Sequence, residues 1–265
     1  MHARSAVVDL YGDHLRQHGW WAPVAGVVAL AQDCGVQPPA ARTAVSRLVR
    51  EGWLVAEARG AVRGYAATPL ARERLVSAHA RIYATGPRPW DGTWHVVMVD
   101  HGGERRRRDQ VSASLSYLGY GRLAPGAWVS PRPSEELSGV LRRHGARWTA
   151  VRGPLDAEAG PPAALVARVW DLEALATAYG DFLAALPDPR QARDLAPAGV
   201  YQVRARLVHE WRKFLFTDPD LPARVLPDGW VGLEARARFL EVATALRPAA
   251  ERHVAGRLRA GEVAA

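Results

Sequence analysis

The chain has 265 residues, a length that favours two or three domains. It carries 35 Lys and Arg against 27 Asp and Glu, a formal net charge of +8 that favours a polyanionic partner. The single cysteine, Cys34, excludes an intramolecular disulfide and a cysteine-based zinc site, and no run of 18 apolar residues marks a membrane span. We therefore expect a soluble, cytoplasmic protein without a cofactor.

The first 36 residues predict two helices separated by a short strand. Apolar residues at Val7, Val8, Tyr11 and Leu15 have helical spacing, which predicts a helix over 3–15. Trp21 is expected in a short strand that pairs with a later hairpin. A second helix is expected over 24–33, closed by the glycine at 35.

The stretch 37–54 predicts a short helix with one apolar and one cationic face. Pro38-Pro39 favour a helix start, and Gly52 favours its end. The polar face carries no carboxylate and consists of Arg42, Thr43, Ser46, Arg47 and Arg50. Such a face suits an anionic surface, whereas the alternative is an ordinary amphipathic helix with a solvated basic face.

Residues 53–56 and 65–67 predict two short strands around an Arg/Gly-rich tip. Helix, helix, turn, helix and hairpin is the outline of a winged helix-turn-helix, whose recognition helix enters the major groove of DNA. Arg59 and Arg63 of the hairpin, or wing, would then reach phosphates or the minor groove. A further helix is expected over 69–83.

The run Ala3-Arg-Ser-Ala, the run Asp9-Leu-Tyr-Gly-Asp13 and the longer run from Arg42 to Leu54 together resemble the N-terminal domain of the PaaX family. Members of that family are transcriptional repressors of phenylacetic acid degradation operons. The resemblance implies that the polar residues of 42–50 contact DNA.

After a linker at 85–89, the pattern predicts strands over 94–100, 119–123, 127–130 and 147–151, with helices over 104–117 and 134–144. Ser134 is the expected N-cap of the second helix. The order βαββαβ is typical of a ferredoxin-like domain. The arginines at 105–108 are expected in a solvated helix start, with DNA phosphates as the alternative partner.

The segments 89–95 and 118–131 resemble the central PaaX domain, which is similar in fold to the small CRISPR-associated ferredoxin-like nuclease. That nuclease has an aspartate where Asp100 stands here. Metal-dependent phosphodiester cleavage needs clustered carboxylates, but Asp100 is followed by His101-Gly-Gly, one glutamate and four arginines. We expect a structural aspartate, and a metal-dependent phosphodiesterase or nuclease is the alternative function.

The last third of the chain predicts helices over 165–183, 200–216 and 233–246, with a frayed tail after Pro248. The segments 207–222 and 226–232 again resemble the PaaX family. The whole chain is therefore predicted to be an α+β multidomain protein. Its expected parts are a winged helix-turn-helix domain over 1–86, a ferredoxin-like domain over 87–160 and a mainly helical effector or dimerisation domain over 161–265.

The resemblance implies a repressor that an aryl-CoA thioester, typically phenylacetyl-CoA, releases from its operator. We expect such a repressor to be a homodimer, because one short helix rarely provides enough discrimination and paired helices read a palindrome. Such a ligand needs cationic donors beside an aromatic wall. Both kinds of group occur close together at His209, Trp211, Arg212 and Lys213, the candidate effector residues. The alternative is that Trp211 belongs to the core and His209 pairs with a neighbouring segment.

No nucleophile motif or metal-ligand pattern stands out in the sequence, so we expect a regulator and no enzyme. A non-specific nucleic-acid-binding or scaffold protein is a third hypothesis, which rests on the charge alone.

Overall fold

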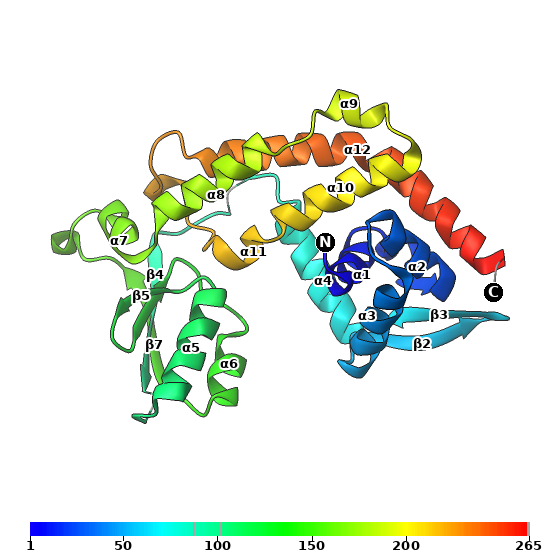
Figure 1. Ribbon diagram of the computed structural model, residues 1–265. Helices are drawn as coiled ribbons and strands as arrows, with labels where there is room; N and C mark the ends of the chain where they lie inside the picture. Colours follow the sequence, from blue (N-terminus) through cyan, green and yellow to red (C-terminus); the bar gives the residue numbers. More distant parts are fainter. Residues whose placement is uncertain (87, 101, 264–265) are drawn as a thin grey trace. The chain divides into compact units, whose positions relative to one another are not determined.

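The computed structural model describes residues 1–86, 88–100 and 102–263; Pro87, His101 and the last two residues lie outside the described part. It contains helices and two antiparallel sheets (Figure 1), so the α+β class is confirmed. The chain divides into two compact units. The first comprises Met1–Ala84, Phe182–Arg212 and Arg236–Ala265, and the second comprises Thr85–Asp181 and Lys213–Ala235.

The N-terminal part of the first unit has the predicted order of helices and strands. Its elements are α1 (Ala3–Asp13), η1 (Leu15–His18), β1 (Trp21–Pro23), α2 (Val24–Asp33), α3 (Pro38–Arg50), β2 (Leu54–Arg59), β3 (Val62–Ala67) and α4 (Pro69–Ile82). The sheet order is β1-β3-β2, with Trp21 paired to Ala66. The predicted strand at Trp21 is therefore confirmed.

Local chemistry explains the limits of α3. Two prolines begin the helix, where a missing N–H leaves no bond unmade, and Gly52 follows it with a φ of 72°. The apolar face packs inward through Ala41, Ala44, Val45 and Leu48, all of which are buried.

The β2–β3 hairpin packs tightly against β1, and Gly64 makes this possible. A Cβ atom at Gly64 would lie 2.5 Å from the Ala22 carbonyl oxygen and 2.5 Å from the Trp21 ring. Only a glycine allows this approach between β3 and β1.

The C-terminal residues of the first unit lie in α9 (Pro189–Arg193), α10 (Pro197–Trp211) and most of α12 (Val231–Val263). The prediction of a frayed tail after Pro248 is wrong, because α12 continues through this proline. Ala250, Val254 and Leu258 recur every four residues and are buried in the same core as α1 and α3. Burial of this stripe outweighs the helix-breaking tendency of the proline.

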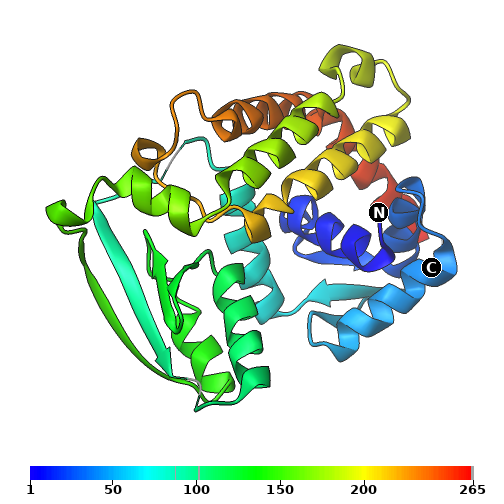
Figure 2. The same ribbon diagram turned by 60° about the vertical axis from the view of Figure 1, so that its left-hand side comes forward.

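The second unit contains the predicted βαββαβ order. Its elements are β4 (Thr93–Asp100), α5 (Arg105–Tyr117), β5 (Gly121–Ala124), β6 (Ala127–Ser130), α6 (Leu137–Arg143) and β7 (Arg147–Pro154). The sheet is antiparallel with the order β5-β6-β4-β7, the ferredoxin-like arrangement. Helices α5 and α6 cover one face of it (Figure 2). On that face Val97 packs with Leu115 and Leu141.

Three predicted helix limits are corrected. Helix α6 begins at Leu137 because Ser134 caps a turn instead, its Oγ accepting a bond from the Glu136 N–H at 3.3 Å. The helix expected over 165–183 is two helices, α7 (Pro162–Val169) and α8 (Leu172–Ala184). Between them Trp170 is extended and stacks on Trp94, with ring centroids 6.2 Å apart.

The helix expected over 200–216 likewise ends at Trp211, and α11 (Phe214–Thr217) follows it. Two short 3₁₀ helices, η2 (Ala157–Ala159) and η3 (Ala223–Val225), complete the second unit. The predicted segments 1–86 and 87–160 each lie almost wholly in one unit, whereas 161–265 is shared between both. The three-part division stays a prediction. None of the helices in the described part combines the length and the apolar character needed to cross a membrane.

Candidate nucleic-acid interface

The outward face of α3 carries side chains that can meet an anion. All of its predicted contact residues are exposed, namely Arg42, Thr43, Ser46, Arg47 and Arg50. Within the described residues, none of the three arginines has an ion-pair partner. Glu51, which directly follows the helix, is paired with Arg4 at 2.9 Å and does not neutralise this face.

The hydroxyl of Thr43 already makes one hydrogen bond within the helix, since it donates to the Pro39 carbonyl oxygen at 3.0 Å. This bond fixes the side chain against the helix and leaves the hydroxyl oxygen available as an acceptor. Thr43 can therefore accept a bond or make a methyl contact, whereas the arginines supply the charge.

The β2–β3 hairpin places its two arginines differently. The Arg59 guanidinium donates to Glu57 at 2.9 Å and lies over the Trp21 ring, 4.7 Å from its centroid. Arg63 is exposed on β3, opposite Ala58. Arg59 thus packs along the hairpin, while Arg63 projects from it without an ion-pair partner among the described residues.

Arg59→Ala is expected to lower the free energy of unfolding by about 0.5–1 kcal/mol, because it removes a half-exposed cation–π contact. Urea unfolding followed by tryptophan fluorescence would measure the loss. Arg63→Ala removes the same charge without the ring contact and is the matched control. Equal midpoints for both variants would show that the Trp21 contact does not stabilise the hairpin.

Two of the four candidate effector residues lie together around Asp9 of α1. The Nδ1 atom of His209 is 2.8 Å from one carboxylate oxygen, and the Nε atom of Arg212 is 2.6 Å from the other. Asp9 itself is buried, with its side chain 7% exposed. Both side chains are therefore engaged by an internal carboxylate.

The other two candidate effector residues are elsewhere. Trp211 is 4% exposed, donates its indole N–H to the Ile82 carbonyl oxygen at 3.2 Å and stacks on Phe239 at 4.7 Å. Lys213 lies in the second unit, exposed at the start of α11. The geometry of Trp211 and His209 is that of the core alternative, and the assignment of the four residues to an effector stays a prediction.

The first unit also has an open groove between α9 and α12, with a volume of about 640 Å³. It is lined by Pro189, Arg190, Ala237, Leu240, Glu241, Thr244 and Ala245. None of the four candidate effector residues lines it.

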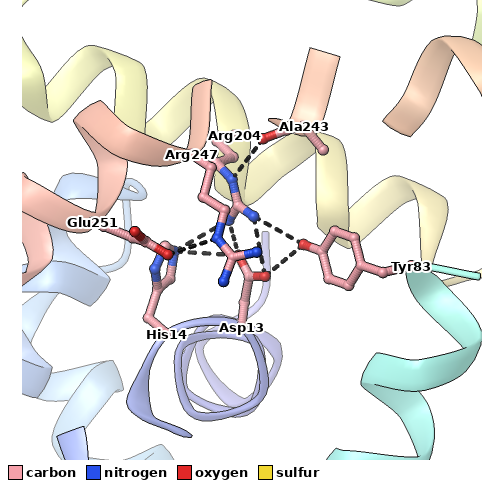
Figure 3. Close-up of polar contacts among 7 residues, drawn as sticks. All are labelled: Asp13, His14, Tyr83, Arg204, Ala243, Arg247 and Glu251. Atoms are coloured by element: carbon pink, nitrogen blue, oxygen red, sulfur yellow. Dashed lines mark hydrogen bonds and ion pairs between the residues drawn. The ribbon is translucent and has the colours of Figure 1, made fainter. Parts of the chain in front are cut away.

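Sequence reasoning missed a buried polar network centred on Arg204 of α10 (Figure 3). The Arg204 side chain is 2% exposed and forms an ion pair with Asp13. It also donates to the Tyr83 hydroxyl at 3.0 Å and to the Ala243 carbonyl oxygen at 3.2 Å. The sequence pattern that could have indicated this network is a charged residue within an apolar helical stripe, because Arg204 stands four residues from both Val200 and Val208.

Burial shifts the titration of this network. It lowers the pKa of Arg204 to about 10, which leaves the guanidinium charged at neutral pH. It also lowers the pKa of His14 to about 4. The carboxylate of Glu251 opposes this lowering of the His14 pKa and the guanidinium of Arg247 adds to it, but burial is the largest cause. His14 is therefore neutral at physiological pH.

Asp100, at the end of β4, makes contacts with neighbouring groups of the chain. One carboxylate oxygen is 2.6 Å from the Arg147 guanidinium, and the other accepts the Gly102 N–H at 2.9 Å. Within the described residues, no group of three or more His, Cys, Asp or Glu side chains could hold a metal ion. In the arginine run after it, Arg105, Arg107 and Arg108 each lie within 4.0 Å of a carboxylate of the same helix start.

Family models match along most of the chain. They are described as PaaX-like protein over 2–68, PaaX protein central Cas2-like domain over 87–154 and PaaX-like protein C-terminal domain over 170–256. The transcriptional repressor PaaX of Escherichia coli K12 is 28% identical over 258 residues, covering 93% of this chain and 81% of that protein. A solved structure, the uncharacterized protein Rv0674 from Mycobacterium tuberculosis, is similar with a TM-score of 0.62, 28% identity and 98% coverage of both chains.

Proposed function

The chain belongs to the PaaX family and is a transcriptional regulator, and from this premise we propose that it represses an aromatic catabolic operon of the phenylacetate type. The observation that carries the proposal is the exposed face of α3, whose arginines have no carboxylate partner among the described residues. Such a face binds phosphates through charge and base edges through its guanidinium groups.

In this proposal residues 1–86 form a winged helix-turn-helix. Helix α3 would enter the major groove, with Arg42, Arg47 and Arg50 toward bases or phosphates and Thr43 and Ser46 as shorter contacts. The hairpin would be the wing, and Arg63 is better placed than Arg59 to reach a phosphate because Arg59 is held by Glu57 and Trp21.

We propose that the protein acts as a homodimer on a two-fold symmetric operator, since one short helix reads too few base pairs for strong discrimination. The effector would be an aryl-CoA thioester such as phenylacetyl-CoA. Binding of the thioester would lower operator affinity.

The nuclease alternative is not proposed. Its candidate ligand Asp100 is occupied by Arg147, and the carboxylate cluster that cleavage needs is missing from the described part of the chain. The similarity to a transcriptional repressor supports a regulator and no enzyme.

A fluorescence-anisotropy titration tests the proposal directly. The labelled DNA is the region upstream of the protein's own gene, titrated with and without phenylacetyl-CoA, and random DNA of equal length is the competitor. We expect tight, sequence-selective binding that the thioester releases and free phenylacetate does not.

Operator binding that the thioester does not weaken would contradict the proposed effector but would still support the DNA-binding function. Equal affinity for operator and random DNA would contradict the repressor proposal and favour a non-specific nucleic-acid-binding protein.

A further inference from the structure

Three carboxylates of the N-terminal helices are held by cations from the C-terminal helices. Asp9 of α1 is paired with α10, as described above. Asp13 at the end of α1 is paired with Arg204 of α10. Asp33 of α2 is 2.7 Å from His253 and 2.8 Å from Arg257, both of α12. The three acidic side chains are only 7–11% exposed, so each depends on its cation for compensation.

Arg204 joins more elements than the other two contacts do. It lies on α10, contacts Asp13 at the end of α1 and the Tyr83 hydroxyl just after α4, and donates to a carbonyl oxygen of α12 (Figure 3). Tyr83 also contacts Asp13 directly, because its hydroxyl donates to that carboxylate at 2.5 Å. The guanidinium thus ties two N-terminal helices to two C-terminal ones.

Helix α3 packs in the same apolar core as these helices. Leu10 of α1, Leu48 of α3, Tyr201 of α10 and Val254 of α12 belong to one buried cluster. A close-packed core has little free volume, so α1 cannot shift against α10 and α12 without disturbing α3.

We propose that Arg204 is a positioning residue for operator binding: it holds α1, and through the shared core α3, in register with α10 and α12. A ligand that shifts α10 or α12 would then change operator affinity through this contact. The inference rests on the proposed repressor function and adds how the C-terminal helices control the DNA-contacting face.

The physical reason is the cost of a buried, unpaired charge. Separating Arg204 from Asp13 would break the ion pair between two buried charges, which is costly in a low-dielectric interior. The fixed fork of the guanidinium accepts few geometries, so it adds a directional constraint to the close-packed core. The network therefore couples the position of α1 to those of α10 and α12, so a ligand that shifts α10 or α12 would also displace α1.

A merely structural ion pair makes a different prediction. It would change the stability of the protein but leave the operator affinity of the folded molecules, and their release by a ligand, as in the wild type. The test must therefore measure binding on fully folded variants.

The principal variant is Tyr83→Phe, which deletes the hydroxyl between Arg204 and Asp13 and keeps the ring. Tyr179→Phe is the matched control, because its hydroxyl also donates to an aspartate, Asp218, at 2.5 Å, but in the second unit. Arg204→Lys keeps the charge and loses the fork. Circular dichroism would establish that each variant is folded before the titrations.

In operator titrations we expect Tyr83→Phe to lower the affinity for operator DNA by roughly 2- to 30-fold, or to reduce by the same factor the change in that affinity that phenylacetyl-CoA causes. Arg204→Lys is expected to show the larger loss and Tyr179→Phe none. Wild-type affinity and wild-type release in both network variants would overturn the proposal.

Hydrogen exchange separates this inference from the proposed function. Amides of α1 and α3 are expected to exchange faster in Tyr83→Phe than in the wild type, while those of α5 are unchanged. This readout needs neither DNA nor thioester. A wild type that fails to bind its operator would refute the repressor function, whereas unaltered exchange in α1 and α3 would refute the positioning role. If Arg204→Lys does not fold, Tyr83→Phe alone decides.

Discussion

A variant that ends at Pro248 is expected to lose on the order of 5 kcal/mol of its free energy of unfolding. The missing residues include Val254 and Leu258, which are 0% and 5% exposed and pack in the core shared by α1 and α3. They also include His253 and Arg257, so Asp33 would lose both of these partners. This loss is a large share of the roughly 5–15 kcal/mol that stabilise a typical domain.

Urea denaturation followed by far-ultraviolet circular dichroism would measure this loss. Leu258→Ala is an intermediate variant, expected to cost about 2–5 kcal/mol through the cavity it leaves. Arg259→Ala, at the neighbouring exposed position, is the control and should leave the midpoint unchanged. A shortened chain as stable as the full one would mean that the tail is frayed after all.

Arg47→Ala is expected to weaken operator binding by ~1–3 kcal/mol, roughly 5- to 150-fold in the dissociation constant, if its guanidinium reads a base. Arg47 is exposed in the last turn of α3 and has no ion-pair partner in the described part of the chain. Its removal leaves the core untouched, so the unfolding midpoint should not change. Anisotropy titrations at several salt concentrations would measure both the loss and the salt slope.

Arg206→Ala is the matched control for Arg47→Ala. Arg206 is an exposed arginine of α10 in the same unit, and within the described residues it too has no ion-pair partner. It removes one charge away from the α3 face, so only a small effect is expected. Equal losses for the two variants would remove Arg47 from the contact surface and leave net charge as the cause.

Most of the C-terminal helical residues belong to the compact unit that carries α3. The sequence suggested a separate effector domain, but α10 and most of α12 pack in the same compact unit as α1–α4. A ligand that acts on these helices acts on the unit that carries α3.

Much of the local structure could be predicted from short-range patterns. The two faces of α3 follow from the 3.6-residue period, and the βαββαβ order follows from alternating strands and helices between glycines. The regulatory function was predicted from the family resemblance, because it could not be inferred from the spacing of apolar residues or from the net charge. The predicted contact residues on α3 share one face of the helix, and all of them are exposed.

Errors arose where a distant contact outweighed a local preference. Trp170 continues a helical pattern but is extended because it packs on Trp94. Pro248 is a helix breaker by chemistry, yet α12 passes through it because the residues beyond are buried against α1. Propensity differences of about 1–3 kcal/mol per residue are outweighed by such burial.

The sequence by itself determined the family, the amphipathic helix with its uncompensated arginines and the ferredoxin-like order, because these depend on neighbours along the chain. Only the tertiary structure decided that His209 and Trp211 are internal, that the tail is core and that Arg204 pairs with Asp13. The last two residues are 191 positions apart in the chain. Such a pair of buried charges forms only when the whole unit folds, and the local spacing of residues in the sequence does not indicate it.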